Sequence, residues 1–207
     1  MSQATQRARD AKTSMYRELI VDAAERLFAE RGYDGTKIQD VAAESGLSLG
    51  TLYSLFGGKA GVYDALHNER LGELFLLAGE SMASDERAAE RLVKGNRVFI
   101  RWLVKHPDFL RIHLNSSAAW AFNPQQVGPD LADAWRRGIE LIADVLSQAM
   151  KEGDVYEGDP LIAARLLVAM QQVLMSAWVE SGMKGDPDEL VDQIEQQLVR
   201  ALFRSKR

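Results

Sequence analysis

One stretch, residues 36–59 (TKIQDVAAESGLSLGTLYSLFGGK), most constrains the fold, because it reads as two short helices joined by a tight turn. Thr36 and Gln39 have the spacing of a capping box, which would open the first helix. Gly46 can take the left-handed conformation that ends it, and Ser48 is a good N-cap for the second. The second helix is too short to be stable alone, so neighbouring elements must hold it.

The second helix would present hydroxyl-bearing or very small side chains to solvent. Such a face suits a helix that enters the major groove of DNA, where hydroxyls bond phosphate oxygens or base edges. Lys37 and Lys59 would lie at helix N-termini, where phosphate is favoured. An ordinary surface helix at a bend is the alternative. The predicted DNA contacts are Thr36, Lys37, Ser48, Leu49, Gly50, Thr51, Tyr53, Ser54 and Lys59.

Residues 17–63 resemble the DNA-binding domain of the tetracycline-repressor (TetR) family. The matching residues are Ala23, Ala24, Leu27, Phe28, Gly32, Tyr33, Thr36, Val41, Ala42, Gly46, Leu47, Ser48, Gly50, Thr51, Leu52, Tyr53, Phe56 and Lys59. The resemblance implies a dimeric, ligand-responsive transcriptional regulator, most often a repressor. Such a regulator would bind a palindromic double-stranded DNA operator and be released by a small apolar or aromatic effector.

The chain departs from that family's pattern at three places. Leu49 stands where a basic residue is common, and Ser54-Leu55 replaces a pair that often includes an aromatic residue or histidine. The run GGKAG at 57–61 lacks the usual polar cap and acidic residue. Because glycine is flexible and a poor helix former, we expect a weakly held start to the fourth helix and a loose joint.

The apolar periodicity of the whole chain predicts an all-α fold. A flexible arm at 1–14 carries Arg7, Arg9 and Lys12, and a three-helix DNA-binding domain follows at 15–60. Residues 61–207 would form a larger helical bundle for ligand binding and dimerisation. A helix from Lys59 to about Met82 would be long enough to link the two domains.

Charge and composition exclude several classes of protein. The net charge is −5, with 8 basic and 8 acidic residues in positions 1–60, so DNA binding would depend on locally placed cations. Cysteine is absent, which excludes disulfides and thiolate metal sites. We find no signal peptide and no run of about 18 apolar residues, and so expect a cytoplasmic protein with no membrane contact.

The remaining helices are predicted at 84–106, 107–113, 131–150, 160–180 and 187 onward, with an irregular segment at 115–129. Asp159-Pro160 and Asp186-Pro187 read as cap and first-turn pairs. The last two helices would form a dimeric four-helix bundle, as the family resemblance also implies, although a central core helix is the alternative. The predicted interface residues are Leu161, Leu167, Leu174, Ile194, Leu198 and Leu202.

A ligand pocket is predicted among the aromatic and flexible apolar residues of this bundle, with plain core packing as the alternative. The candidates are Asn96, Phe99, Trp102, Phe109, His113, Trp120, Met170, Leu174 and Trp178. Polar groups could come from Asn96, His113, Gln171 and Gln172.

The sequence contains no motif of an enzyme or a metal site. His67, His106 and His113 lack ligand spacing, and there is no HExxH, Walker or nucleophile-elbow pattern. We therefore expect no cofactor, no metal and no catalysis. A helical adaptor that binds only protein is the main alternative, and an all-α enzyme is a weaker one.

Overall fold

The computed structural model describes residues 3–122 and 129–204, without the side chains of residues 116–122, 129–131 and 134. Within this part the fold is all-α, as predicted, with only an isolated bridge pairing Val155 with Phe203. The helices are α1 (Gln3–Gly35), α2 (Ile38–Ser45), α3 (Leu49–Phe56), α4 (Lys59–Met82), α5 (Ala88–Lys105), α6 (Pro107–Phe122), α7 (Pro129–Lys151), α8 (Pro160–Glu180) and α9 (Pro187–Leu202).

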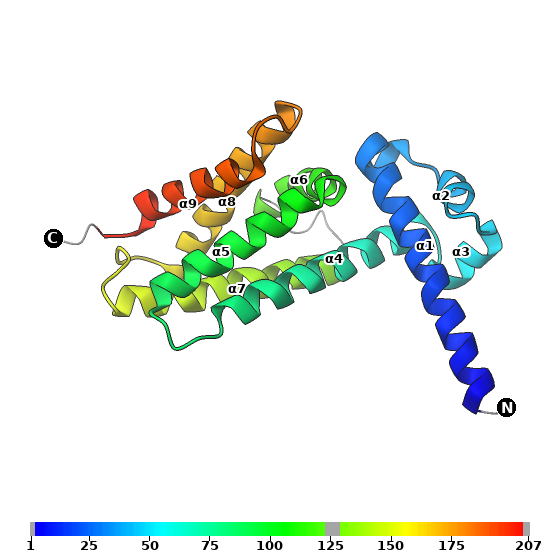
Figure 1. The fold of residues 1–207 in the computed structure, drawn as a ribbon, viewed down its shortest axis with the longest axis horizontal. Coiled ribbons are helices and arrows are strands. Elements are labelled where there is room, and N and C mark those ends of the chain that lie inside the picture. The colour runs from blue at the N-terminus through cyan, green and yellow to red at the C-terminus, as the bar shows by residue number, and fades with distance from the viewer. Residues whose placement is uncertain (1–2, 123–128, 205–207) are drawn as a thin grey trace. The chain divides into compact units, whose positions relative to one another are not determined.

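The chain divides into two compact units, residues 1–70 and residues 71–207, and the boundary falls inside α4. In the first unit α1 packs on α2, and α2 packs on α3 (Figure 1). Its core includes Ile20, Phe28 and Leu52, all at most 2% exposed. Gly32, with φ of 71°, kinks the end of α1, since the positive φ interrupts regular helix there.

The N-terminal arm differs from the prediction. Residues 3–14 were expected to be flexible, but they continue α1 as regular helix (Figure 1). Their side chains are exposed. The side-chain amide of Gln6 donates to Asp10, and the hydroxyl of Thr13 donates to the Arg9 carbonyl. Four-residue spacing joins both pairs along one helix, which explains how polar side chains support the extension.

The second unit is a bundle in which α5 packs on α7 and α9, and α8 packs on α7 and α9 (Figure 1). The cap predictions for its last two helices are confirmed. Asp159 accepts from the backbone N–H groups of Leu161 and Ile162, and Asp186 accepts from that of Asp188. A proline follows each cap, where its missing N–H costs nothing.

Two helix boundaries were predicted wrongly. Residues 115–122 are the last part of α6, where an irregular segment was expected. The small polar residues there suggested a loop, yet serine and alanine are compatible with helix. The fifth helix begins at Ala88, after Arg87 as its N-cap, and Ser84 lies outside it. The side chain of Glu152, in the turn just after α7, accepts from the Ala88 N–H at 3.0 Å, a long-range contact that the local pattern does not reveal.

By length and composition alone, helix α8 is long and apolar enough to cross a membrane. Only 28% of its most apolar window is buried in the described structure. One such helix is weak evidence for a membrane span, because apolar helices of soluble proteins share these properties. Its exposed aliphatic side chains nevertheless need a partner of some kind.

Candidate nucleic-acid interface and ligand cavity

Helix α3 is held by contacts at both of its ends. Ser48 caps it as predicted, accepting from the Thr51 N–H at 3.1 Å, and Gly46 takes the expected left-handed conformation with φ of 70°. At the other end, the Arg17 guanidinium donates to the Leu55 carbonyl at 3.2 Å and lies 4.5 Å from the Phe56 ring centroid. Arg17 therefore positions this short helix, a role that sequence spacing gave no reason to expect.

The exposed face of α3 is polar and small. Ser48, Gly50 and Ser54 are exposed, and Tyr53 is 49% exposed. Leu49 and Thr51 are half-buried, with the hydroxyls of Thr51 and Ser48 2.8 Å apart. The adjacent α2 begins after Lys37, which is also exposed. The structure therefore presents most of the predicted DNA contacts on the surface.

Thr36 does not belong to this surface. It is 1% exposed, and its hydroxyl bonds the carbonyls of Leu27 and Gly32. The N-cap of α2 is Lys37, with no side-chain cap bond, so the predicted capping box is also wrong. Thr36 instead secures the kinked end of α1, because its hydroxyl satisfies carbonyls that the helix end leaves unpaired.

Lys59 is also engaged within the first unit. Its ammonium donates to the carbonyls of Tyr33 and Thr36 at 2.7 and 3.1 Å, and it lies 4.1 Å from the Tyr33 ring centroid. These contacts place its charge at the end of α1 and give Lys59 a structural role, while its phosphate contact stays a prediction. Burial, and secondarily the Asp64 carboxylate, raise the pKa of the Tyr33 hydroxyl.

The glycine-rich joint between α3 and α4 is tight, contrary to the expectation of a loose one. A Cβ added at Gly61 would lie 1.8 Å from the Phe56 carbonyl oxygen, so the backbones of the two helices are in direct contact. Gly57, with φ of 74°, provides the left-handed turn between them. Glycine is therefore required here by close approach and by conformation.

A histidine lies in the core of the same unit. His67, on α4, is fully buried, and its Nδ1 lies 2.9 Å from the Tyr63 carbonyl. Its ring packs 4.2 Å from the Tyr63 ring. Burial lowers the pKa of His67 to about 4, because the charged imidazolium loses its hydration there.

The second unit contains an apolar cavity of about 50 Å³ between α4, α5, α7 and α8. Of the predicted pocket residues, Asn96, Phe99 and the polar candidate Gln171 line it. The other lining residues were not predicted: Phe75, Ala78, Met82, Leu92, Gly95, Trp135, Gly138, Ile139, Leu141, Ile142, Leu167 and Val168. The missed residues come from α4 and α7 as well as α5 and α8, and only tertiary packing brings them together.

The polar contribution to the cavity is one amide pair. Asn96 and Gln171 are 6% and 3% exposed, and the Gln171 Nε2 donates to the Asn96 Oδ1. The Asn96 Nδ2 is buried and makes no hydrogen bond. A buried donor without an acceptor is costly, so this group calls for an explanation.

The other predicted pocket residues lie elsewhere. Trp102 stacks on His106, with ring centroids 4.0 Å apart, and Phe109 meets Trp102 edge-on at 5.7 Å. His113 lies between aromatic rings in a neighbouring part of the core. The remaining α8 candidates, Met170, Leu174 and Trp178, are half-buried and do not line the cavity. The side chain of Trp120 lies outside the described residues.

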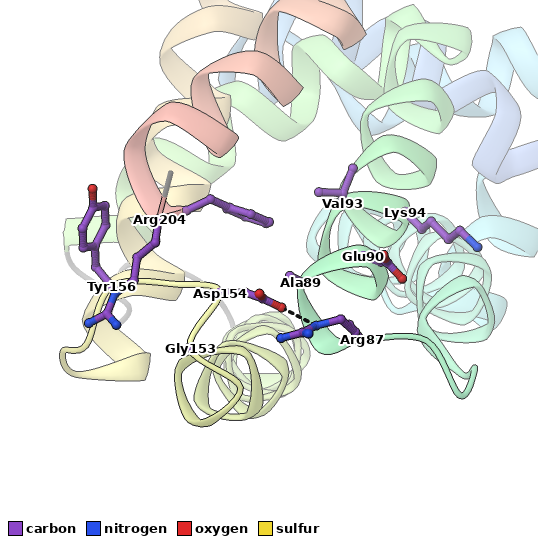
Figure 2. A pocket seen from close by; sticks show the side chains of 10 residues that line it. Arg87, Ala89, Glu90, Val93, Lys94, Gly153, Asp154, Tyr156 and Arg204 are labelled. Carbon is purple, nitrogen blue, oxygen red and sulfur yellow. Dashed lines mark hydrogen bonds and ion pairs between the residues drawn. The ribbon is translucent and has the colours of Figure 1, made fainter. Parts of the chain in front are cut away.

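A larger surface groove of about 990 Å³ lies at the start of α5, beside the α7–α8 turn and the end of α9. Figure 2 shows Arg87 directed at Asp154, and these side chains form an ion pair at 2.7 Å. Lys94 pairs with Glu86, and Arg204 lies 3.6 Å from Glu157. Because the cations already have acidic partners, the groove does not form an anion site.

The predicted interface residues are divided between core and surface. Leu167, Ile194 and Leu198 are at most 3% exposed and belong to the core of the second unit. Leu174 and Leu202 are half-buried, and Leu161 is exposed. The exposed aliphatic face of α8 consists of Leu161, Ile162, Leu166 and Val173, with exposures from 45% to 68%, and Val199 on α9 is 40% exposed.

Known proteins are similar to this chain in sequence and in fold. Residues 20–66 match the profile of bacterial regulatory proteins, tetR family. The fatty acid metabolism regulator protein of Bacillus subtilis is 22% identical over 188 residues, covering 88% of this chain and 93% of that protein. The fatty acid degradation regulator FadR of Bacillus halodurans superposes with a TM-score of 0.76, at 20% identity, over 91% of this chain and 97% of that one.

A third similar protein, AibR, was solved in complex with isovaleryl coenzyme A and operator DNA. It superposes with a TM-score of 0.73, at 21% identity, over 88% of this chain and 97% of that one. The described residues contain no group of three histidine, aspartate or glutamate side chains that could hold a metal. With its capped helix–turn–helix and its helical C-terminal unit, the chain carries the DNA-binding domain of the tetR family at residues 20–66 and has the fold of tetR-family transcriptional regulators.

Proposed function

We propose that the protein binds a palindromic DNA operator as a homodimer, represses transcription there, and is released by a small apolar or aromatic effector. The observation that carries the DNA part is the exposed polar face of α3, which is capped by Ser48 and supported by Arg17. Ser48, Gly50, Tyr53 and Ser54 would contact base edges or phosphates.

The cations for phosphate contact would be Lys37 and the basic residues of the helical arm. Arg7, Arg9 and Lys12 are exposed on α1, and Asp10 is the one acidic residue among them. An unpacked helical extension is marginally stable alone, and phosphate contacts would stabilise it. Domain roles follow from this assignment, with DNA binding in the first unit and effector binding and dimerisation in the second.

The dimer would form through the exposed face of α8 with α9. Leu166 and Val173 are 61% and 68% exposed, and they lie seven residues apart on one side of α8. Large aliphatic side chains on a helix of this length favour a symmetric partner, because the same face on a second copy buries both. A twofold dimer would place two recognition helices about 34–36 Å apart on successive major grooves.

The effector would occupy the cavity beside Asn96 and shift the dimer toward a conformation that fits the operator poorly. Differential affinity of about 1–3 kcal/mol is enough for such a shift. Helix α4 contributes residues to both units and would transmit the change. The protein would act in the cytoplasm, where bacterial DNA is accessible.

The test is binding of the purified protein to duplex DNA from upstream of its own gene, followed by fluorescence anisotropy during a salt titration. A dimer that makes about six phosphate contacts should lose about 10³-fold in affinity between about 50 and 200 mM salt. A scrambled duplex of the same composition is the control. Equal, weak binding to both duplexes would favour the protein-binding adaptor instead.

A further inference from the structure

The cavity of the second unit is small for a ligand site. Its volume of about 50 Å³ holds one or two water molecules, whereas pockets for small ligands measure about 300–1,000 Å³. A ligand must therefore displace side chains from the wall. The side chains to be displaced are those that fill the space beside glycines, which have no side chain of their own.

Two glycines identify those side chains. A Cβ added at Gly95 would lie 2.6 Å from the Cγ and Sδ of Met82, and one added at Gly138 would lie 3.0 Å from the Cζ of Phe75. Met82 and Phe75 therefore pack directly on the backbones of α5 and α7, in two glycine notches. Both come from α4, and methionine in particular adopts new rotamers easily. Rotation of these two side chains would open the cavity.

The chemistry of the wall restricts the ligand. None of the described lining residues is charged, so a carboxylate or phosphate would be buried there without a counterion, at high cost. The polar groups are the amides of Asn96 and Gln171, joined by one hydrogen bond, with the Asn96 Nδ2 unpaired. An amide pair joined by a single bond retains a free N–H donor whichever way the two groups are turned.

We propose that the ligand is an uncharged, mainly apolar molecule whose carbonyl oxygen accepts a hydrogen bond from the Asn96–Gln171 amide pair, and that it enters by displacing Phe75 and Met82 from the glycine notches. Calling this ligand the effector rests on the proposed function, whereas its chemical class follows from the cavity alone. The proposed ligand differs from an acyl-CoA, because the phosphates of an acyl-CoA would find no cation among the described lining residues.

Three matched probes test the ligand class by isothermal titration calorimetry. Cyclohexanone, cyclohexane and cyclohexanecarboxylate share one ring and differ in the oxygen that they offer. Cyclohexanone should bind about tenfold more tightly than the other two, because it alone combines neutrality with an acceptor. Equal binding of ketone and hydrocarbon, tighter binding of the carboxylate or of its coenzyme A thioester, or no binding of any probe would overturn the proposal.

Variants locate the contact. Asn96→Leu should abolish the tenfold preference for the ketone while leaving cyclohexane binding unchanged, and Asn115→Leu, at an exposed asparagine, should keep it. If Asn96→Leu fails to fold, the double variant Asn96→Leu/Gln171→Leu removes both partners and avoids an unpaired amide. Phe75→Ala should tighten binding of both ketone and hydrocarbon, because no ring has to be displaced. Weaker binding of both would refute the notch as the point of entry.

Operator binding separates this proposal from the proposed function, since it is measured without any probe. A protein that binds cyclohexanone through Asn96 but no operator would support the ligand class and refute the repressor. A protein that binds its operator but shows no Asn96-dependent preference for the ketone would support the repressor and refute the ligand class.

Discussion

Helices α3 and α8 both expose side chains that their own unit leaves uncovered, but the chemistry of the two faces is opposite. The exposed part of α3 is built of hydroxyls, a glycine and the amphipathic Tyr53, whereas that of α8 is aliphatic, with Leu166 and Val173 more than 60% exposed. A polar face suits a hydrated polyanion, and an aliphatic face suits another apolar surface. The kind of side chain left exposed therefore indicates the kind of partner.

The two helices are also supported differently. Both ends of α3 are fixed by specific polar contacts, and the Gly61 backbone touches the Phe56 carbonyl. Helix α8, by contrast, borders a cavity, and its Gln171 belongs to an amide pair in which the Asn96 Nδ2 has no acceptor. A ligand-controlled regulator requires this division between a rigid DNA-binding helix and an adaptable ligand-binding unit. Four experiments would test this contrast, and the largest expected effect comes first.

Charging the α8 face should break the proposed dimer. In the variant Leu166→Glu/Val173→Glu, four carboxylates would meet at the symmetric interface, so the dimer dissociation constant should rise about 10³-fold or more. Sedimentation velocity would show a monomer. Leu76→Glu is the matched control, since Leu76 on α4 is 62% exposed, nearly the same as Leu166. A double variant that remains dimeric would remove α8 from the interface.

Adding one methyl group to the α3–α4 joint should destabilise the first unit. Gly61→Ala forces a Cβ against the Phe56 carbonyl, and we expect a loss of about 3 kcal/mol in the free energy of unfolding together with loss of operator binding. Gly72→Ala is the control, because nothing lies within 4 Å of a Cβ there and helix propensity should raise stability by up to about 1 kcal/mol. Equal stability of the two variants in urea denaturation would contradict the close contact.

Acid should weaken the first unit through His67. Its pKa is about 4 in the folded chain and near 6.5 when unfolded, so the unfolded state takes up the proton first as the pH falls. The stability is intact above about pH 6.5 and declines toward pH 4, by about 3 kcal/mol in total. His67→Leu has no proton to bind, so its unfolding free energy should approach that of the wild type as the pH falls. Parallel pH profiles for the two proteins would show that His67 does not contribute.

Truncating Tyr53 should have the smallest effect, since Tyr53 is one exposed member of the polar face of α3. Tyr53→Ala should weaken operator binding about tenfold, by loss of one contact, while the melting temperature and dimerisation stay unchanged. Tyr156→Ala is a suitable control, because Tyr156 is 55% exposed in the second unit. Unchanged operator affinity in Tyr53→Ala would remove this residue from the DNA contacts.

Much of the fold was predictable because it depends on local chemistry. Ser48, Asp159 and Asp186 cap helices through bonds to residues two or three positions away, which sequence spacing reveals directly. Thr36 and Lys59 looked like members of the same surface, but their bonds reach Leu27 and Tyr33, and no local pattern indicates such partners.

The second unit was harder to predict because its packing depends on partners that are distant in the sequence. An apolar residue on an amphipathic helix can face its own core or a partner, and periodicity does not distinguish the two. Ile194 and Leu198 were expected at an interface and lie in the core, whereas Leu166 and Val173 are exposed. The cavity depends on Gly95 and Gly138, whose importance comes from Met82 and Phe75 on another helix.

The contact between Gly61 and the Phe56 carbonyl has a mechanical consequence. No compressible side chain lies between the end of α3 and the first turn of α4 at this point. A rotation of that turn would therefore push directly on the end of α3. The response at the DNA would then depend on how far the first turn of α4 rotates.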